Sequence, residues 1–364
     1  MTLLCRVLCL GILSASLLGC QGPPIPQELA QAEMQEQELW KMGGPVYAAQ
    51  EYQGYALNLR KTKEDLARER SALAPFRRYD RIQGELRDLL RNGEMLRATI
   101  QERKHARAVA VENQIAAGRS QLDELRHVAS LINEGYLATK NLTKADVALI
   151  EADALYKKGE LVAAQERLNE LESCLRGAQQ VLGPIVTRYT RETQIAEWRR
   201  MAEETVSESR QRGGLAILVS KIDRRLMVYR GGHLVKTYSV AIGRSGSSSK
   251  RHAGDRATPE GKYSIIQKRP KSSYYKALLI NYPNEEDRRR FSAAKERGSI
   301  PRSVGIGGSV EIHGGGKDGM TYGCIALDNA HMAELYDMVE VGTRVTIVGS
   351  TDAKNSLSSA SDGS

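Results

Sequence analysis

The spacing of apolar residues divides the chain into a helical part and a part rich in strands. From 28 to 210 apolar residues recur at intervals of three and four, which predicts amphipathic helices. From 214 to 349 short apolar runs alternate with polar residues and glycine turns, and a period of two is typical of half-buried strands. The pattern therefore predicts an α+β multidomain protein, with an all-α N-terminal region followed by a mostly β domain.

Two stretches of the helical region carry more detailed predictions. A coiled-coil-like seam is expected along Ile115, Gly118, Leu122, Leu125, Ala129, Ile132 and Tyr136. Residues 152–168 predict a helical hairpin of tetratricopeptide type, which would bind a protein partner. Such repeats need stacked copies, and no second copy is apparent, so a hairpin that packs on its own neighbours stays open beside it. Pro184 is expected to end one helix before a last one over 185–210.

The N-terminus has the pattern of an export signal. A basic start is followed by the apolar run 7–18, which is too short to cross a bilayer, and by Leu17-Leu18-Gly19-Cys20. Residues 1–19 are therefore predicted to be a lipoprotein signal peptide, with Cys20 lipidated and 20–27 forming a proline-rich tether. A plain secretory signal with a chance cysteine is the alternative. The prediction places the protein in the cell envelope, anchored by lipid on the periplasmic face, and Gln21 favours the outer membrane in a Gram-negative cell.

The net charge and the cysteine content restrict the classes of binding partner and the possible disulfides. The 53 basic and 44 acidic residues give a net charge of +9, which suits nucleic acid, anionic lipid or an acidic polymer. Export excludes nucleic acid as a working partner. Once the signal is removed and Cys20 is lipidated, Cys174 and Cys324 remain as thiols, either free or joined in a disulfide. The tail 350–364 is rich in Ser and Asp and is predicted to be disordered.

Candidate chemistry centres on His313 and Cys324, which lie on either side of a glycine-rich loop. Val310 and Ile312 alternate with polar neighbours, which predicts a strand that ends at His313. A free thiol has a pKa of about 8.5, so a reactive cysteine needs a positive neighbour to lower that value. His313 is the natural candidate for that neighbour, and the two residues together suggest nucleophilic catalysis.

Ile312-His313-Gly314 and Thr321-Tyr322-Gly323-Cys324-Ile325-Ala326-Leu327 resemble the L,D-transpeptidase (YkuD-type) catalytic domain family. The resemblance covers about 214–349 and implies acyl transfer on peptidoglycan stem peptides without a cofactor or metal. It implies that Cys324 is the nucleophile and that His313 takes and returns the proton. It further implies that the backbone carbonyl of Gly314 orients His313 and that the amides of Gly323 and Cys324 bind the oxyanion. Thr321 and Tyr322 are candidate substrate-binding residues, with a hydrogen bond within the loop or a structural role as the alternative for Thr321.

The sequence departs from the family pattern at two positions. Tyr322 stands where the family has a histidine, and Ala326 stands where it has an arginine. The Gly-Cys-Ile-Ala-Leu form resembles a sub-branch that includes enzymes detaching proteins from peptidoglycan. Transpeptidation, hydrolysis of the same class of bond, and an inactive lipid-anchored wall-binding scaffold therefore all remain open.

The sequence lacks the residues that two other kinds of site would require. A zinc site using His313 and Cys324 would need at least one more protein ligand, and none stands at a characteristic spacing. A phosphate site over 314–316 would need the Lys-Ser/Thr pair that follows such glycines, and this pair is absent.

Overall fold

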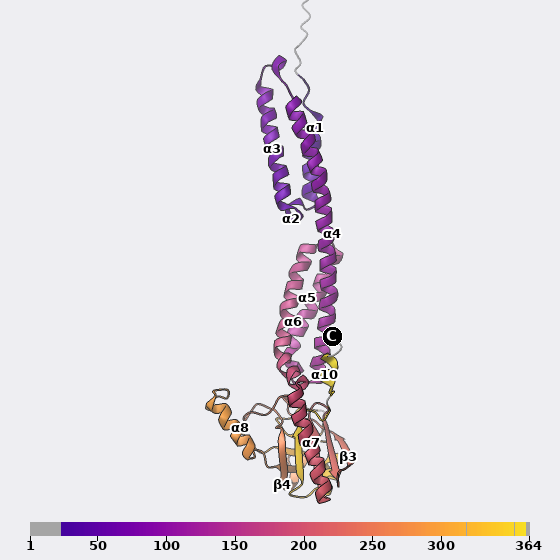
Figure 1. The fold of residues 1–364 in the computed structure, drawn as a ribbon, viewed down its shortest axis with the longest axis vertical. Coiled ribbons are helices and arrows are strands. Elements are labelled where there is room, and N and C mark those ends of the chain that lie inside the picture. The colour runs from indigo at the N-terminus through magenta and orange to yellow at the C-terminus, as the bar shows by residue number, and fades with distance from the viewer. Residues whose placement is uncertain (1–22, 318, 353, 362–364) are drawn as a thin grey trace, which may run out of the picture. The chain divides into compact units, whose positions relative to one another are not determined.

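The change of apolar period near residue 212 corresponds to a change from helices to strands in the structure. The computed structural model describes residues 23–317, 319–352 and 354–361 and has helices from Gln27 to Arg212 followed by a sheet (Figure 1). The predicted fold class is therefore confirmed. The predicted signal peptide and Cys20 lie outside the described residues. Within the described residues, no helix is both long enough and apolar enough to span a membrane.

The chain forms two compact units, which divide between Ala110 and Val111. The sequence predicted a boundary near 207–214, where helix gives way to strand. The observed division falls earlier, inside one long helix, because the later helices share their apolar core with the sheet.

The first unit is a small helical bundle. Its elements are α1 (Gln27–Lys41), α2 (Gly44–Tyr47), α3 (Ala49–Ser71), η1 (Ala74–Phe76) and the first half of α4 (Asp80–Leu131). The core contains a buried polar residue, Gln35, whose Nε2 donates to the carbonyl of Leu90 at 3.2 Å and whose Oε1 accepts from Tyr55 at 2.9 Å. A Cβ at Gly93 would lie 2.0 Å from Gln35 Oε1, so the glycine makes room for this side chain.

The second unit begins with the remaining half of α4 and the helices that follow it. These are η2 (Asn133–Ala138), α5 (Thr139–Lys157), α6 (Leu161–Thr190) and α7 (Glu192–Arg212). The helices α5 and α6 form the predicted hairpin, and their buried residues join those of α4 in one core, which favours packing on neighbours over a repeat array. The prediction of a helix break at Pro184 is wrong, because α6 continues through it and ends at Thr190.

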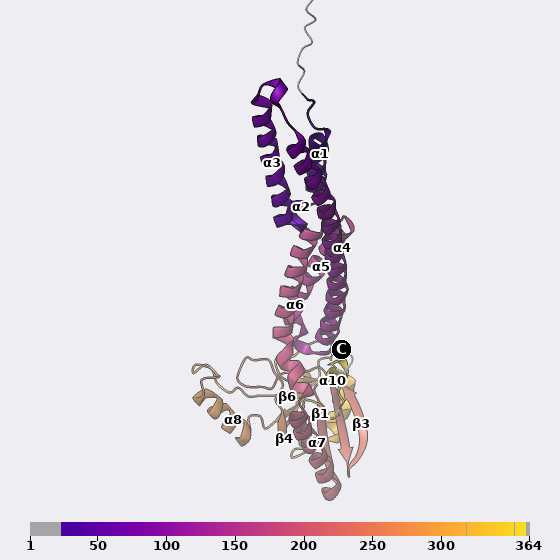
Figure 2. The same cartoon turned by 45° about the horizontal axis from the view of Figure 1, so that its top comes forward.

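The sheet has the strand order β3-β2-β1-β8-β4-β5-β6-β7 (Figures 1 and 2). Its strands are β1 (Leu215–Ser220), β2 (Arg225–Arg230), β3 (His233–Ser239), β4 (Gly261–Ser272), β5 (Tyr275–Ile280), β6 (Glu311–His313), β7 (Ile325–Ala326) and β8 (Arg344–Val348). The pairs β1–β8 and β6–β7 are parallel and the others are antiparallel. His313 ends β6, as the alternation predicted.

The central strands are buried on both faces, which explains their nearly continuous apolar runs. In β1, Ile217 and Val219 belong to the core of the sheet domain, whereas Leu218 belongs to the core of the helices. The helix α7 covers the second face (Figure 1), where Thr205 and Thr346 share a hydroxyl hydrogen bond of 2.6 Å. The sheet domain therefore rests directly on the helices of its own unit.

Three further helices complete this unit: α8 (Glu285–Glu296), α9 (Asn329–Met338) and α10 (Ser356–Ser361). The tail was predicted to be disordered, but α10 is ordered against α6. Leu357 is fully buried, and Asn355 Nδ2 donates to the carbonyl of Tyr189 at 2.8 Å. The prediction failed because it was based on the polar composition of the segment. A single apolar side chain, Leu357, packs into the core of the helices and holds the segment there.

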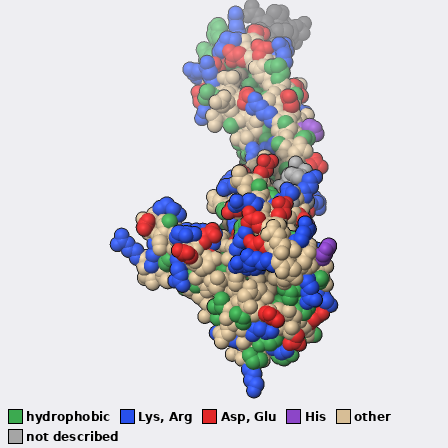
Figure 3. All heavy atoms as spheres, turned by 60° about the horizontal axis from the view of Figure 1, so that its bottom comes forward, with side chains coloured by type: hydrophobic (Ala, Val, Ile, Leu, Met, Phe, Trp, Pro, Cys, Tyr) green, Lys and Arg blue, Asp and Glu red, His purple; other side chains and the backbone are tan. Residues whose placement is uncertain are grey.

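Positive and negative side chains are mixed on the face of the molecule that Figure 3 shows. On the face shown in Figure 3, Lys and Arg side chains alternate with Asp and Glu side chains instead of forming one separate basic area. The net charge therefore gives no indication of a single large polyanion-binding surface on that face.

Candidate active site

The loop that carries Cys324 is positioned by close contacts between backbones. A Cβ at Gly243 would lie 2.2 Å from the carbonyl oxygen of Arg256 and 3.0 Å from Gly323 Cα. Gly323 has a φ of +126°, and a Cβ there would lie 2.8 Å from the carbonyl oxygen of Ala257. Only glycine fits at these two positions, because three separate segments meet immediately before Cys324.

The hydroxyl of Thr321 fastens this loop. It accepts a hydrogen bond from the amide of Gly323 at 3.1 Å and donates to the carbonyl of Cys324 at 2.7 Å. The resemblance implied that the Gly323 amide binds the oxyanion, and the sequence left Thr321 either as a substrate contact or as a hydrogen-bonding residue within the loop. In this structure the two groups bond to each other, so Thr321 shapes the turn and the Gly323 amide is not free.

The pairing of β6 with β7 brings His313 and Cys324 together. His313 lies beside Ala326 in the parallel register, and Cys324 precedes Ala326 by two residues. Cys324 lies immediately before β7, so this pairing places it beside β6, where the backbone and the side chain of Glu311 both affect the pKa of its thiol.

His313 is held in one orientation. Its side chain is buried, its ring stacks on Tyr274 with centroids 4.5 Å apart, and its Nδ1 lies 2.6 Å from the carbonyl oxygen of Gly314. A carbonyl oxygen only accepts, so Nδ1 carries the hydrogen in this contact. The neutral ring then has its lone pair on Nε2, where it can receive a proton. The Gly314 contact implied by the family resemblance is present.

Cys324 is half-buried, and its thiol contacts the carbonyl oxygen of Ser309 at 3.9 Å. Burial raises the pKa of Cys324, and the Glu311 carboxylate also raises it, whereas the Glu311 amide and the Lys250 ammonium lower it. The net shift is upward. His313 is not among the causes of this shift, so its predicted effect on the pKa of Cys324 stays a prediction, and a raised pKa favours the protonated thiol. Both Cys174 and Cys324 are free, which excludes the disulfide between them.

Lys250 reaches the site from the loop between β3 and β4. Its Nζ donates to Asp255 Oδ1 at 2.8 Å and would lie 3.8 Å from a Cβ at Gly323. The side chain is 6% exposed, so water screens its charge only weakly. No pattern in the sequence singles out Lys250, because it lies far from the motif in a loop with many charged residues.

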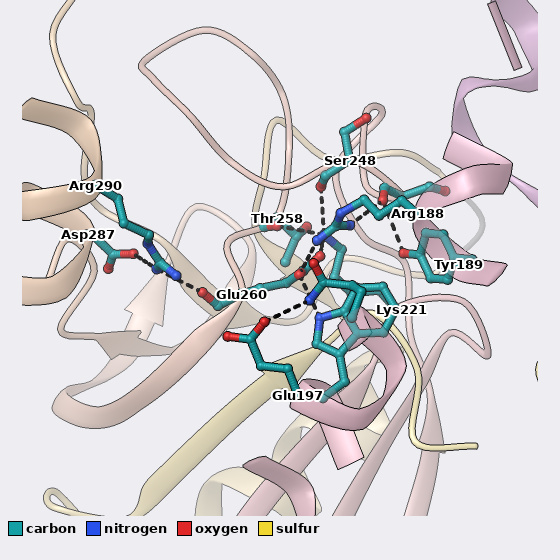
Figure 4. A network of polar contacts seen from close by, with 12 residues as sticks. Arg188, Tyr189, Glu197, Lys221, Ser248, Thr258, Glu260, Asp287 and Arg290 are labelled. Carbon is teal, nitrogen blue, oxygen red and sulfur yellow. Dashed lines mark hydrogen bonds and ion pairs between the residues drawn. The ribbon is translucent and has the colours of Figure 1, made fainter. Parts of the chain in front are cut away.

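Below this loop lies a buried network of charges (Figure 4). The ammonium of Lys221, which is fully buried, donates to Glu260 Oε1 at 2.7 Å, to the carbonyl of Thr258 at 3.0 Å and to that of Ser248 at 2.7 Å. Glu260 also pairs with Arg188 of α6. The network joins the two ends of the loop to the helices, so the loop has one defined position.

The segment η2 of the helical region holds the same loop from another side. Asn133 Nδ2 donates to the carbonyl of Gly243 at 2.7 Å, and the Glu134 carboxylate accepts from the amides of Ser247 at 3.2 Å and Ser248 at 2.9 Å. Glu134 is 2% exposed. A buried carboxylate that accepts backbone amides is a strong contact, so η2 and the site loop form one structure.

The glycine loop 314–316 is tied down by its own amides. The amide of Gly314 donates to the carbonyl of Lys276 at 3.1 Å, that of Gly315 to Asn329 Oδ1 at 2.7 Å, and that of Gly316 to the carbonyl of Leu327 at 3.0 Å. These amides are therefore not available to cradle a phosphate. Within the described residues, no three His, Cys, Asp or Glu side chains gather as a metal site requires.

Residues 215–347 match the YkuD family model, described as the L,D-transpeptidase catalytic domain. The matched span coincides with the sheet and contains His313 and Cys324. Over these residues the chain is similar to the catalytic domain of L,D-transpeptidases.

Two curated relatives agree with this assignment. YafK of Escherichia coli strain K12 is 32% identical over 108 residues, which are 29% of this chain and 37% of YafK. YqjB of Bacillus subtilis strain 168 is 29% identical over 133 residues, which are 36% of this chain and 69% of YqjB. Both names give the L,D-transpeptidase activity as provisional. The chain thus spans little more than a third of YafK.

Solved structures of the same type are also similar. L,D-transpeptidase 1 of Mycobacterium tuberculosis has 17% identity and a TM-score of 0.25, with 37% of this chain and 62% of that one covered. An L,D-transpeptidase of Mycobacterium smegmatis has 17% identity and a TM-score of 0.24, with 36% and 58% covered.

Proposed function

We propose that this protein catalyses cysteine-dependent acyl transfer on peptidoglycan stem peptides. The observation that carries the proposal is the pairing of β6, which ends at His313, with β7, which begins directly after Cys324, within residues that match the L,D-transpeptidase catalytic domain. The contact between His313 Nδ1 and the Gly314 carbonyl supports it, because this contact leaves Nε2 as the basic atom.

The first half of the reaction forms a thioester. Because the pKa of Cys324 is raised, the thiol must lose its proton to His313 Nε2 as it attacks the carbonyl carbon after the third stem residue. A carbon–sulfur bond forms while the carbon–nitrogen bond breaks, and the protonated imidazole returns the proton to the leaving amine of D-alanine. The Cys324 amide is proposed as an oxyanion donor, and the Gly323 amide joins it only if it exchanges its bond to Thr321.

The second half depends on the acceptor. An amine of another stem peptide attacks the thioester carbonyl, gives its proton to His313 and forms a new amide, while the sulfur leaves and regains a proton. Water as acceptor gives a carboxylic acid and makes the enzyme a hydrolase of the same bond class. The side chain of Ala326 ends at a methyl group, so the site lacks the family's usual arginine and the acceptor preference has to be measured.

The test uses the purified protein with isolated sacculi, followed by digestion and mass spectrometry of the products. New dimers show transpeptidation, and loss of D-alanine or release of linked protein shows hydrolysis. Cys324→Ala should abolish either product. Cys174→Ala is the matched control, because it removes the other free thiol, which lies in α6 away from the sheet, and it should keep full activity.

The proposal fails if the Cys324→Ala variant still makes the product. It also fails if the unaltered protein gives no product and a carbapenem forms no adduct on Cys324. In that case the inactive wall-binding scaffold becomes the better interpretation.

We also propose that Cys20 is lipidated and anchors the protein in the cell envelope, on the basis of the sequence 17–20. Metabolic labelling with an alkyne fatty acid should mark the unaltered protein and leave Cys20→Ala unlabelled. Equal labelling of both would disprove the anchor. A protein partner for the helical region stays a prediction.

A further inference from the structure

A pocket of about 280 Å³ lies next to the loop that carries Cys324, and the reaction steps above do not use it. It is lined by Tyr136, Arg244, Arg256, Met320, Thr321 and Tyr322. The hydroxyl of Thr321 is bonded to the carbonyl of Cys324, so the pocket opens within three residues of the proposed nucleophile. A group bound there would lie beside the loop that carries the sulfur.

The charged groups of the pocket are guanidinium groups. Arg244 lies over the ring of Tyr136, 4.1 Å from its centroid, and Arg256 lies over the ring of Tyr322 at 5.3 Å. In the part of the chain that the structure describes, neither arginine forms an ion pair with Asp or Glu. Stacking on an aromatic face leaves the N–H edges of a guanidinium free to bind a planar anion.

Both arginines are fixed by the backbone of the site. The amide of Arg244 donates to the carbonyl of Thr321 at 2.9 Å, and the amide of Ser245 donates to the carbonyl of Arg256 at 3.0 Å. Arg256 has a φ of +56°, a left-handed conformation that is uncommon for residues with a side chain. The backbone contacts around the Cys324 loop therefore determine the positions of the Cα atoms of Arg244 and Arg256.

The helical region supplies one wall. Tyr136 belongs to η2, whose neighbours Asn133 and Glu134 bind the backbone of the loop that carries Arg244. Without η2, Arg244 would lose the ring below it. This contact gives the helical region a direct part in forming the pocket.

We propose that this pocket binds a carboxylate of the stem peptide and holds the substrate for attack by Cys324. The proposal rests on the function proposed above. A carboxylate matches the planar fork of a guanidinium, and two arginines without an acidic partner favour an anion strongly over its neutral amide. A stem peptide with lysine at its third position offers two such groups, the C-terminal carboxylate and the α-carboxylate of its γ-linked D-glutamate, and the pocket chemistry suits either.

The test measures binding to the full chain carrying Cys324→Ala, so that no turnover intervenes. The probes are the tetrapeptide L-Ala-γ-D-Glu-L-Lys-D-Ala, the same peptide with a C-terminal amide, and the same peptide with D-isoglutamine in place of D-glutamate. The free acid should bind about tenfold more tightly than one of the two amides, the loss expected for a charge-assisted hydrogen bond. The amide that weakens binding identifies the carboxylate.

The arginines are then tested in the same background. Arg244→Gln and Arg256→Gln should each reduce the preference for the acid. Arg251→Gln is the matched control, because it lies exposed on the same loop outside this pocket, and it should keep the preference. Tyr136→Phe should also keep it, since the ring remains, whereas Tyr136→Leu should weaken it.

Equal binding of the acid and both amides would overturn the subsite, and so would a preference that survives loss of both arginines. Turnover on sacculi is measured separately with Cys324 intact. One outcome is that the Cys324→Ala variant prefers the acid, with a preference that depends on the arginines, while the protein with Cys324 intact shows no turnover. This result would support the subsite and count against the proposed reaction. The two failures are therefore distinguishable.

Discussion

Replacing Glu260 by glutamine should destabilise the second unit strongly, although the two side chains have nearly the same shape. The Glu260 carboxylate accepts from Lys221 at 2.7 Å and from the Trp198 indole at 3.0 Å, and it pairs with Arg188. Lys221 is fully buried and Arg188 is 20% exposed. The neutral amide would leave both positive charges without their buried partner.

The magnitude follows from two arguments. Burial by itself would raise the pKa of Glu260, but the attraction of Lys221 and Arg188 outweighs it and lowers the pKa from 4.5 to about 2. A shift of this size corresponds to about 3 kcal/mol of differential stabilisation of the charged form. Removing one partner of a buried ion pair typically costs about 3–5 kcal/mol. We therefore expect Glu260→Gln to lower the free energy of unfolding by about 3–5 kcal/mol at pH 7.

The pH dependence has a defined sign. The pKa of Glu260 is lower in the folded state than in the unfolded one, so its contribution is fully present above pH 4.5 and is lost as the pH falls toward 2. The difference between the unaltered protein and Glu260→Gln should therefore stay large from pH 5 to pH 7. It should shrink below pH 4.5.

Urea unfolding followed by the fluorescence of Trp198 measures this effect. Trp40→Phe serves as the background, because these are the two tryptophans of the chain and Trp40 lies in the first unit. Glu204→Gln is the matched control: it makes the same chemical change at an exposed ion pair with Lys262, which is worth less than about 1 kcal/mol. If Glu260→Gln lowers stability no more than this control does, the reasoning is refuted.

Two other predictions concern the loop that carries Cys324. Lys250→Met should slow alkylation of Cys324 by iodoacetamide at pH 7 severalfold, because the Lys250 ammonium lowers the pKa of the thiol. Glu311→Gln should speed the same reaction, because the Glu311 carboxylate raises that pKa. Changes of the same sign in both variants would contradict this reasoning. Thr321→Val should reduce activity on sacculi about tenfold or more while Thr321→Ser keeps most of it, since only serine preserves both hydrogen bonds of the hydroxyl. Equal activities of the valine and serine variants would show that the hydroxyl does not shape the turn.

The sequence determined the local features of this protein. An apolar period of 3.6 changes to a period of two near 212, and the helices and strands follow it, because each element must bury one side of itself. The residues around His313 and Cys324 were also recognisable, because nucleophile and base lie close together along the chain and carry a family pattern. The rule that proline ends a helix failed at Pro184. The helix α6 continues through it because buried residues on both sides of Pro184 pack into the same core.

Contacts between distant segments were decided by the tertiary structure alone. Lys250 reaches the region of Cys324 across many residues, and η2 of the helical region builds one wall of a pocket beside the sheet. The Gly323 amide, which the motif assigned to the oxyanion, is engaged by Thr321 because close packing at Gly243 and Gly323 tightens the turn. The charge around a thiol depends on which loops fold over it, and that arrangement follows from the packing of the whole unit and not from the residues next to the thiol in sequence.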